Sequence, residues 1–192
     1  MSKTLWKSMK AGPKSDSGNE GAWVVGQWCK HEGDLAMCQS GYHASRNVID
    51  AMSYVDAEVI AQVEVRGKHL EQDDKQCWSE MRIIKAWPWT KADSVSLAIY
   101  AAELAIGIFE KRYPDDKRPR QAIDTAKKWL KEPTEENREA TARAAGAAWA
   151  ARAAAEAAAG AAAGAARAKV RTMCHRFVLA RLAKKSKEDR DD

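Results

Sequence analysis

Between residues 140 and 168 the chain is mostly alanine, interrupted by Gly146, Gly160 and Gly164. Alanine has the highest helix propensity of any residue, but each alanine buries little apolar area. A helix of this composition packs only where its neighbours approach closely, and Trp149 is its single large side chain. The run predicts a helical second half, in which Gly160 and Gly164 favour a turn between two helices over one weakened continuous helix.

The composition changes near Pro88–Thr90, which suggests two parts of different architecture. Residues 1–90 hold six of the eight tryptophans and a net charge of −1, from 11 Lys plus Arg against 12 Asp plus Glu. Residues 91–192 hold 21 against 15, a net charge of +6, so the whole chain carries +5. We therefore predict an α+β protein in which a small antiparallel sheet domain with one helix, residues 1–90, packs on an alanine-rich helical bundle, residues 91–184. We expect the polar tail, residues 185–192, to be disordered.

Hydrophobic patterning predicts the elements of the first part. Residues 22–28 are rich in β-branched and aromatic side chains, which favours a strand. Residues 58–65 alternate as in a half-buried strand until Arg66-Gly67, and residues 81–87 predict a further strand. Residues 45–54 place apolar side chains on one helical face and predict a helix.

Helical periodicity dominates the second part. Apolar residues run nearly all round the helix expected from Thr90 to Phe109, so we expect this helix to be central and buried. Pro119 suits the first turn of the next helix, and Thr134 caps the one after it. Residues 170–182 repeat apolar side chains at helical spacing and predict a face directed at a core.

The sequence predicts neither a membrane span nor a secreted protein. The best candidate for a span, residues 92–109, is interrupted by Asp93 and Glu103, so no stretch looks long and apolar enough to cross a bilayer. The N-terminal residues lack the apolar core of a signal peptide, and we expect a cytoplasmic protein, in the host bacterium if a phage encodes it. Four scattered cysteines are too few for a disulfide scaffold of this size.

Two sets of motifs carry resemblances to known families. The segments 30–33 (KHEG), 37–45 (MCQSGYHAS) and 72–78 (QDDKQCW) resemble an uncharacterised domain family common in bacteriophage genomes, over roughly the first 90 residues. The segment 113–123 (YPDDKRPRQAI), with the alanine-rich helices after it, is similar to helical proteins known as putative immunity proteins, named for their genomic association with toxins. The two resemblances imply an accessory protein in phage–bacterium or toxin–immunity conflict, and they carry over no catalytic residue.

The best candidate for a ligand site is the loop that leads into the helix expected over residues 45–54. Backbone N–H groups at a helix start attract anions, and the side chains before it can stack on a base or bond a phosphate. Two arginines flanking Pro119 are suited to gripping a phosphate or a carboxylate. A turn with a core tyrosine, and ion pairs to Asp115 or Asp116, are the alternatives. The predicted ligand-binding residues are Tyr42, His43, Ser45, Arg118 and Arg120.

Four soft ligands also suggest a zinc site. Cys29, His31, Cys38 and His43 lie within 15 residues, and zinc takes such ligands in tetrahedral geometry. Their spacing lacks the usual pair of cysteines two residues apart, so the alternative is that the cysteines are buried and the histidines hydrogen-bonded in a turn. Zinc is the one cofactor that the sequence suggests.

No nucleophile elbow, phosphate loop or dinucleotide fingerprint is present, which lowers the expectation of an enzyme. The eight basic residues of 167–187 are followed by acidic ones and predict a solvated helix face, not a nucleic-acid surface. We hypothesise a non-enzymatic phage inhibitor of bacterial defence that captures a defence protein or a nucleotide-derived signal, with its small-residue helices available for self-association into an oligomer. The alternatives are an immunity protein that binds a toxin directly, and a nucleotide-processing enzyme with ADP-ribosyl-type chemistry at Tyr42 and His43.

Overall fold

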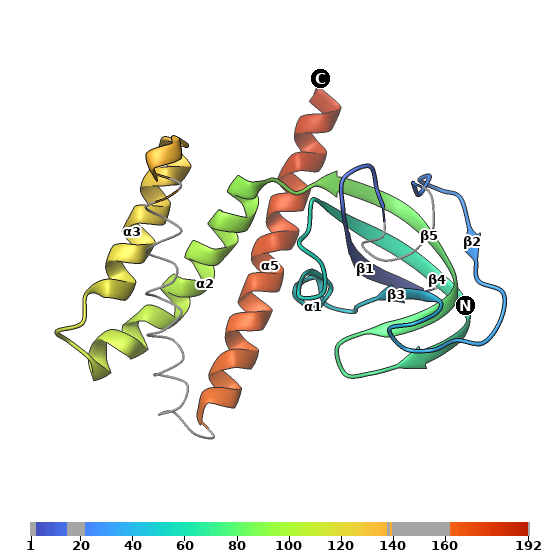
Figure 1. Ribbon diagram of the computed structural model, residues 1–192, viewed down its shortest axis with the longest axis horizontal. Coiled ribbons are helices and arrows are strands. Elements are labelled where there is room, and N and C mark those ends of the chain that lie inside the picture. Colours follow the sequence, from blue (N-terminus) through green and yellow to red (C-terminus); the bar gives the residue numbers. More distant parts are fainter. Residues whose placement is uncertain (1–2, 15–21, 138, 140–161, 192) are drawn as a thin grey trace. The chain divides into compact units, whose positions relative to one another are not determined.

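Two units make up the fold of this computed structural model (Figure 1). One contains Met1–Thr90 together with Val178–Asp192, and the other contains Lys91–Phe177. The structure describes residues 3–14, 22–137, 139 and 162–191.

The first unit is built on a five-stranded antiparallel sheet, so the predicted α+β class is confirmed. Strand β4 (Val59–Glu71) pairs with β1 (Lys3–Met9) on one side and with β5 (Gln76–Pro88) on the other. Two short strands, β2 (Cys29–Lys30) and β3 (Tyr42–Ala44), both pair with β5. The sheet order is β1-β4-β5-β2, with β3 off this path.

The β4–β5 hairpin is longer than the alternating pattern predicted. The pattern ends at Arg66-Gly67, but there the pairing only shifts register, as in a β-bulge, and β4 continues to Glu71. Gly67 has φ +87°, and a Cβ added to it would lie 2.3 Å from Ser79 Oγ. Glycine therefore lets the strand bend and go on, where the sequence pattern suggested that it stops.

One expectation for this unit is wrong, and one strand was not predicted. Residues 22–28 form no strand: Trp23 is buried in the core, but Val24 and Val25 are 59% and 54% exposed in a turn. Strand β1 was not predicted, because Lys7 stands between the inward-facing Leu5 and Met9 and breaks the apolar alternation. Its pairing with β4, fifty or more residues away in the sequence, stabilises a strand that local propensity does not favour.

The C-terminal part of helix α5 (Ala162–Asp191) belongs to the sheet unit. Leu182 is almost completely buried, and Ser186 Oγ accepts hydrogen bonds from Trp87 Nε1 at 2.7 Å and Lys85 Nζ at 2.9 Å. The tail expected to be disordered from residue 185 is instead helical to Asp191, because these contacts hold its first turn.

In the second unit, helix α3 (Arg118–Lys131) confirms the predicted amphipathic stripe. Its Ile123 packs with Ile99 and Ile106 of helix α2 (Lys91–Arg112), and all three side chains are buried. After α3, the backbone N–H of Asn137 donates to Thr134 Oγ1 at 3.2 Å, as the predicted cap requires.

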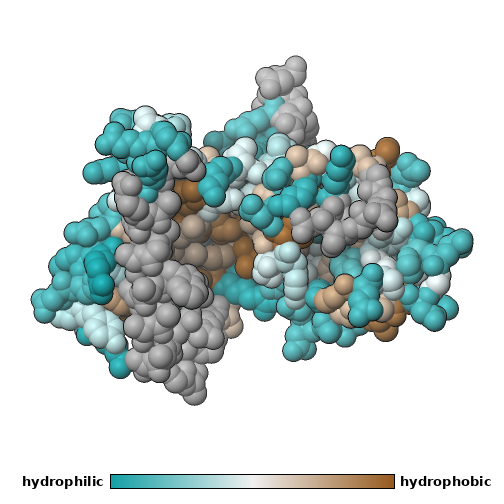
Figure 2. Space-filling view, in the orientation of Figure 1, coloured by the Kyte–Doolittle hydropathy of each residue, from teal (hydrophilic) through white to brown (hydrophobic). Residues whose placement is uncertain are grey.

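Helix α2 is less buried than expected. Among its described side chains only Asp93, Ile99 and Ile106 are buried, and Ile108 is 66% exposed. Apolar colour gathers over the α2 region in Figure 2. Contrary to expectation, this helix is long and apolar enough, by length and composition only, to cross a membrane, a property that core helices of soluble proteins share.

The predicted turn in the alanine-rich run falls mostly outside the described residues. Gly160 lies outside them, whereas Gly164 lies within helix α5, so the chain does not turn at Gly164.

Candidate functional site

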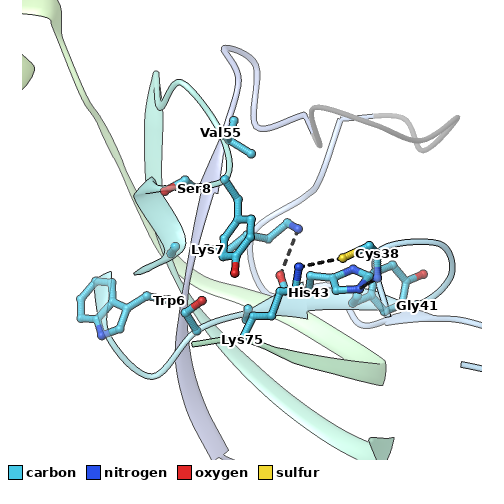
Figure 3. Close-up of a pocket in the computed structure, with 13 residues that line it drawn as sticks. Trp6, Lys7, Ser8, Cys38, Gly41, His43, Val55 and Lys75 are labelled. Atoms are coloured by element: carbon cyan, nitrogen blue, oxygen red, sulfur yellow. Dashed lines mark hydrogen bonds between the residues drawn. The ribbon is translucent and has the colours of Figure 1, made fainter. Parts of the chain in front are cut away.

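A pocket of about 240 Å³ opens in the sheet unit between β1, β3 and the short helix α1 (Val48–Met52) (Figure 3). Three of the five predicted ligand-binding residues, Tyr42, His43 and Ser45, line it. The other lining residues are Trp6, Lys7, Ser8, Cys38, Gly41, Ala44, Ala51, Tyr54, Val55 and Lys75.

A glycine shapes the loop that carries these residues. Gly41 has φ +95°, and a Cβ added there would lie 2.6 Å from both Cys77 Sγ and Leu35 Cδ2. The loop can therefore approach β5 this closely only with glycine at this position. Beyond β3, α1 starts later than predicted, with Asn47 as its cap: the side-chain oxygen of Asn47 accepts from the Ile49 N–H at 2.9 Å.

Tyr42 and Ser45 both make contacts that hold the fold together. Tyr42 is buried, and its ring packs edge-on against Trp23 with centroids 5.2 Å apart. Ser45 exchanges two backbone hydrogen bonds with Trp6, both 2.8 Å long, which hold β3 beside β1. The core-tyrosine alternative is thus the one that the structure contains, and these residues form walls of the pocket.

His43 is held in place as a neutral acceptor. Its Nε2 accepts from the backbone N–H of Cys38 at 2.9 Å, and its carbonyl oxygen accepts from Lys7 Nζ at 3.2 Å. Burial, with smaller contributions from the Lys7 and Lys75 charges, lowers the pKa of His43 below 6.5. The imidazole therefore stays uncharged at neutral pH, and the positive charge at this wall comes from the lysines.

Lys75 and Tyr54 form the outer part of the pocket. Lys75 Nζ donates to Cys38 Sγ at 2.7 Å and lies 4.2 Å from the centroid of the Tyr54 ring. The Tyr54 hydroxyl donates to the Asp74 carboxylate, and this hydrogen bond raises the pKa of Tyr54 to about 12. At neutral pH His43 is therefore uncharged and Tyr54 is protonated.

Ser8 has an unusual hydroxyl. The residue is 5% exposed and lines the pocket, yet its Oγ has no hydrogen-bond partner among the described residues. An unsatisfied buried hydroxyl costs about 1–3 kcal/mol. Lys7 and Ser8 were not predicted to line a pocket, because the strand that carries them was not predicted. Lys75 was not predicted either, because the β4–β5 hairpin brings it to the pocket.

The predicted arginines lie in the other unit and are ion-paired there. Arg118 bonds Asp116 through two nitrogens, at 2.8 and 2.6 Å, and this lowers the pKa of Asp116 to about 2. Arg120 bonds both carboxylate oxygens of Glu110, at 2.9 and 2.8 Å. The ion-pair alternative therefore describes both side chains, with Glu110 taking the place expected for an aspartate.

The four predicted zinc ligands do not converge. His31 Nε2 lies 3.3 Å from the carbonyl oxygen of Asp34, and Cys38 contacts Lys75. Within the described ranges, no three His, Cys, Asp or Glu side chains are grouped closely enough to hold a metal ion. The structure therefore does not assemble the site that the spacing suggested.

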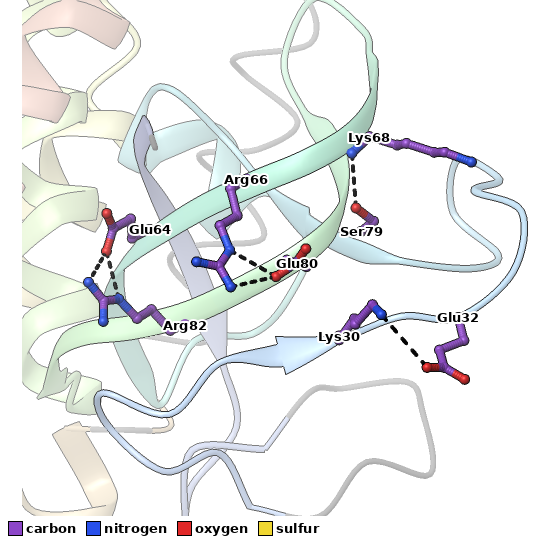
Figure 4. Close-up of polar contacts among 8 residues, drawn as sticks. All are labelled: Lys30, Glu32, Glu64, Arg66, Lys68, Ser79, Glu80 and Arg82. Carbon is purple, nitrogen blue, oxygen red and sulfur yellow. Dashed lines mark hydrogen bonds and ion pairs between the residues drawn. The ribbon is translucent and has the colours of Figure 1, made fainter. Parts of the chain in front are cut away.

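A second polar surface lies on the β4–β5 hairpin (Figure 4). Arg66 pairs with Glu80 at 2.8 Å, and Arg82 pairs with Glu64 at 2.5 Å. Both guanidinium groups also lie over the Trp28 ring, 3.9 and 4.9 Å from its centroid. We call these five residues the Trp28 surface; stacked arginine and tryptophan are the side chains most enriched at the energetic centres of protein interfaces.

The chain has two units, one built on a sheet and one helical. Residues 89–189 match the model of the Imm-5 like putative immunity protein family, and the chain belongs to that family. Residues 4–94 match a domain of unknown function, DUF7666. Both resemblances predicted from the sequence are thereby confirmed, and the chain is an immunity-type protein. No curated protein and no solved structure matches it.

Proposed function

We propose that this protein neutralises a toxin by binding the toxin protein directly. The observation that carries the proposal is the match of residues 89–189 to a family whose members are described as immunity proteins. The absence of a nucleophile motif in the sequence, together with a neutral His43, favours neutralisation by stoichiometric binding over destruction of the toxin.

Charge indicates the kind of partner. Residues 91–192 carry a net charge of +6, and the whole chain carries +5. Complementary charge steers association and penalises wrong partners, so the expected partner is a toxin domain with an acidic contact face. A toxin that binds nucleic acid through a basic surface fits this chain poorly.

The Trp28 surface, whose two arginines and two glutamates balance in charge, is our candidate for a contact made by the DUF7666 part of the chain, in addition to the charge-steered contact of residues 91–192. Its stacked arginines are held by ion pairs before binding, which reduces the conformational entropy lost when a partner docks. Because Arg66 stacks on Trp28, its replacement removes both a charge and an apolar contact.

Co-expression in bacteria with a panel of acidic and basic toxin domains tests the proposal. We expect growth rescue from an acidic member and a stable complex of the purified chain with the inactivated form of that toxin. Arg66→Ala should weaken the complex about tenfold or more, whereas Lys68→Ala, two residues along the same strand, serves as the charge-matched control. Rescue without any complex would contradict direct binding.

A second function is favoured by the pocket beside His43. We propose as the alternative that a phage uses the protein against bacterial defence, capturing a nucleotide-derived signal instead of a protein. Its test is native mass spectrometry of the protein purified from bacterial cells. A nucleotide-sized mass released on denaturation supports capture, and a bare chain contradicts it; the same spectrum reports whether the chain forms an oligomer.

A further inference from the structure

We propose that the Trp28 surface pairs with the same surface of a second copy of this chain, so that the protein without toxin is a symmetric dimer joined through its sheet units. The inference goes beyond toxin binding and is independent of it, because it concerns the chain alone. A toxin that docks on the same surface has to displace the second copy.

The Trp28 surface lies at the open end of one face of the sheet. Side chains alternate along a strand, so Gln62, Glu64 and Arg66 of β4 share this face. Gln62 lies opposite Lys85, whose ammonium group bonds Ser186 of α5. Two and four residues further along β4, the face carries ion pairs instead, and the side chain of Arg66 is 50% exposed. The helix therefore leaves this end of the face accessible to another molecule.

The four charges of the surface alternate in a pattern that is complementary to itself. Glu64 lies opposite Arg82 and Arg66 opposite Glu80, so each strand carries one charge of each sign (Figure 4). When a second copy faces the first across a twofold axis along the strands, β4 of one copy lies over β5 of the other. Each glutamate then faces an arginine, and no two like charges meet. Self-complementarity of this kind is what a twofold contact between identical chains requires.

Net charge favours this surface as the place of self-contact. The whole chain carries +5, and a net charge of one sign makes two copies repel each other. The two arginines and two glutamates of the Trp28 surface sum to zero. Two copies that meet here therefore bring no excess of like charge into the contact.

Exposed apolar side chains lie beside these charges. Val24 and Val25 are 59% and 54% exposed, and Ile84 is 42% exposed. The Gly26 N–H donates to the carbonyl oxygen of Ile83 at 2.8 Å, so the turn that carries the valines lies against β5 next to Ile84. Burial of these side chains supplies the favourable energy of association, while the alternating charges fix its register.

Sedimentation velocity of the full chain over a range of concentrations tests the proposal. We expect an equilibrium between monomer and dimer that stops at the dimer, because a twofold contact is closed. Val25→Ser should weaken the dimer about tenfold, whereas Ile108→Ser, a similarly exposed site on α2, should leave it unchanged. A dimer that depends on Ile108 and not on Val25 would overturn the proposal. So would open-ended assembly, or a chain that stays monomeric and uses the surface only for a toxin.

Charge inversion tests the register of the contact. Arg66→Glu/Arg82→Glu makes all four charges acidic, and Glu64→Lys/Glu80→Lys makes all four basic. Each variant should sediment as a monomer, because like charges then face each other, and an equimolar mixture of the two should form a heterodimer. Lys68→Glu, on β4 but outside the four charges, is the control and should still dimerise.

Surface ion pairs contribute little to stability, so both inverted variants should stay folded, which circular dichroism melts can check. Dimers of either inverted variant alone, or a mixture that stays monomeric, would overturn the assigned register.

Discussion

Gly41 meets two separate requirements, one of backbone conformation and one of space. Its φ of +95° lies in the region that side chains rarely adopt, and neighbouring atoms occupy the place of a Cβ. Gly26 meets only the first requirement, since its φ is +85° but nothing lies within 4 Å of the Cβ position. Substitutions at Gly41 and Gly26 can therefore distinguish the cost of backbone strain from the cost of a steric clash at Cβ.

We expect Gly41→Ala to lower the free energy of unfolding by about 2–4 kcal/mol, and Gly26→Ala by about 1–2 kcal/mol. Urea denaturation of both variants, followed by tryptophan fluorescence, measures the difference. Equal losses in the two variants would show that the loop relaxes away from Cys77 and Leu35 at no cost.

His43 predicts how stability depends on pH. Its pKa is lowered in the folded state, so below pH 6.5 the unfolded chain takes up a proton that the folded chain resists. The stabilisation is complete above that pH and is lost as the pH falls toward the lowered pKa. His43→Gln keeps a side-chain acceptor for the Cys38 N–H but does not titrate.

We therefore expect the parent to lose more unfolding free energy than His43→Gln between neutral and mildly acidic pH, measured by urea denaturation at each pH. The other three histidines are common to both proteins and cancel in the comparison. Parallel pH profiles for the two proteins would contradict the assignment.

At the scale of elements, prediction succeeded where the pattern is local and continuous. The stripe of α3 and the alternation of β4 each repeat within one segment, so their faces are readable without knowledge of their neighbours. Strand β1 was not predicted, because its extended conformation depends on pairing with β4, which is distant in the sequence. The same holds for the pocket. The loop with His43 was predicted from local sequence, whereas Lys7 and Lys75 were not, because long-range strand pairing brings them to the pocket.

Helix α2 allows a prediction within a single element. Ile106 is 8% exposed and packs with Ile99 and Ile123, whereas Ile108 is 66% exposed. Ile106→Ala should cost about 2–4 kcal/mol, and Ile108→Ala less than about 0.5 kcal/mol, by urea denaturation followed by circular dichroism. A large loss from Ile108→Ala would instead mean that this face is covered in solution.

For the whole molecule, the two family matches do not coincide with the two units. The immunity match runs to residue 189, yet Val178–Asp192 belongs to the unit of the sheet. We therefore expect the stability of the sheet to depend on the C-terminal part of α5, which lies within the immunity match.

Leu182→Ala tests this dependence. We expect the variant to destabilise the sheet unit by about 2–4 kcal/mol, because Leu182 is 2% exposed within that unit. Hydrogen exchange of the β4 and β5 amides should report the loss, and the exposed Lys187→Ala should not change it. Unaltered exchange in Leu182→Ala would mean that the sheet is stable without α5.

The hydrogen bonds from Trp87 and Lys85 to Ser186 can form only late in synthesis, because Ser186 is made about one hundred residues after them. The β4–β5 hairpin can pair as soon as it leaves the ribosome, because its strands are adjacent in sequence. Residues 178–192 are made about ninety positions later, after the whole helical unit, so at roughly 5–20 residues per second the sheet waits several seconds for its last contacts. During that interval the nascent chain exposes the surface that α5 later covers, and a chaperone or a neighbouring copy has its best opportunity to bind there.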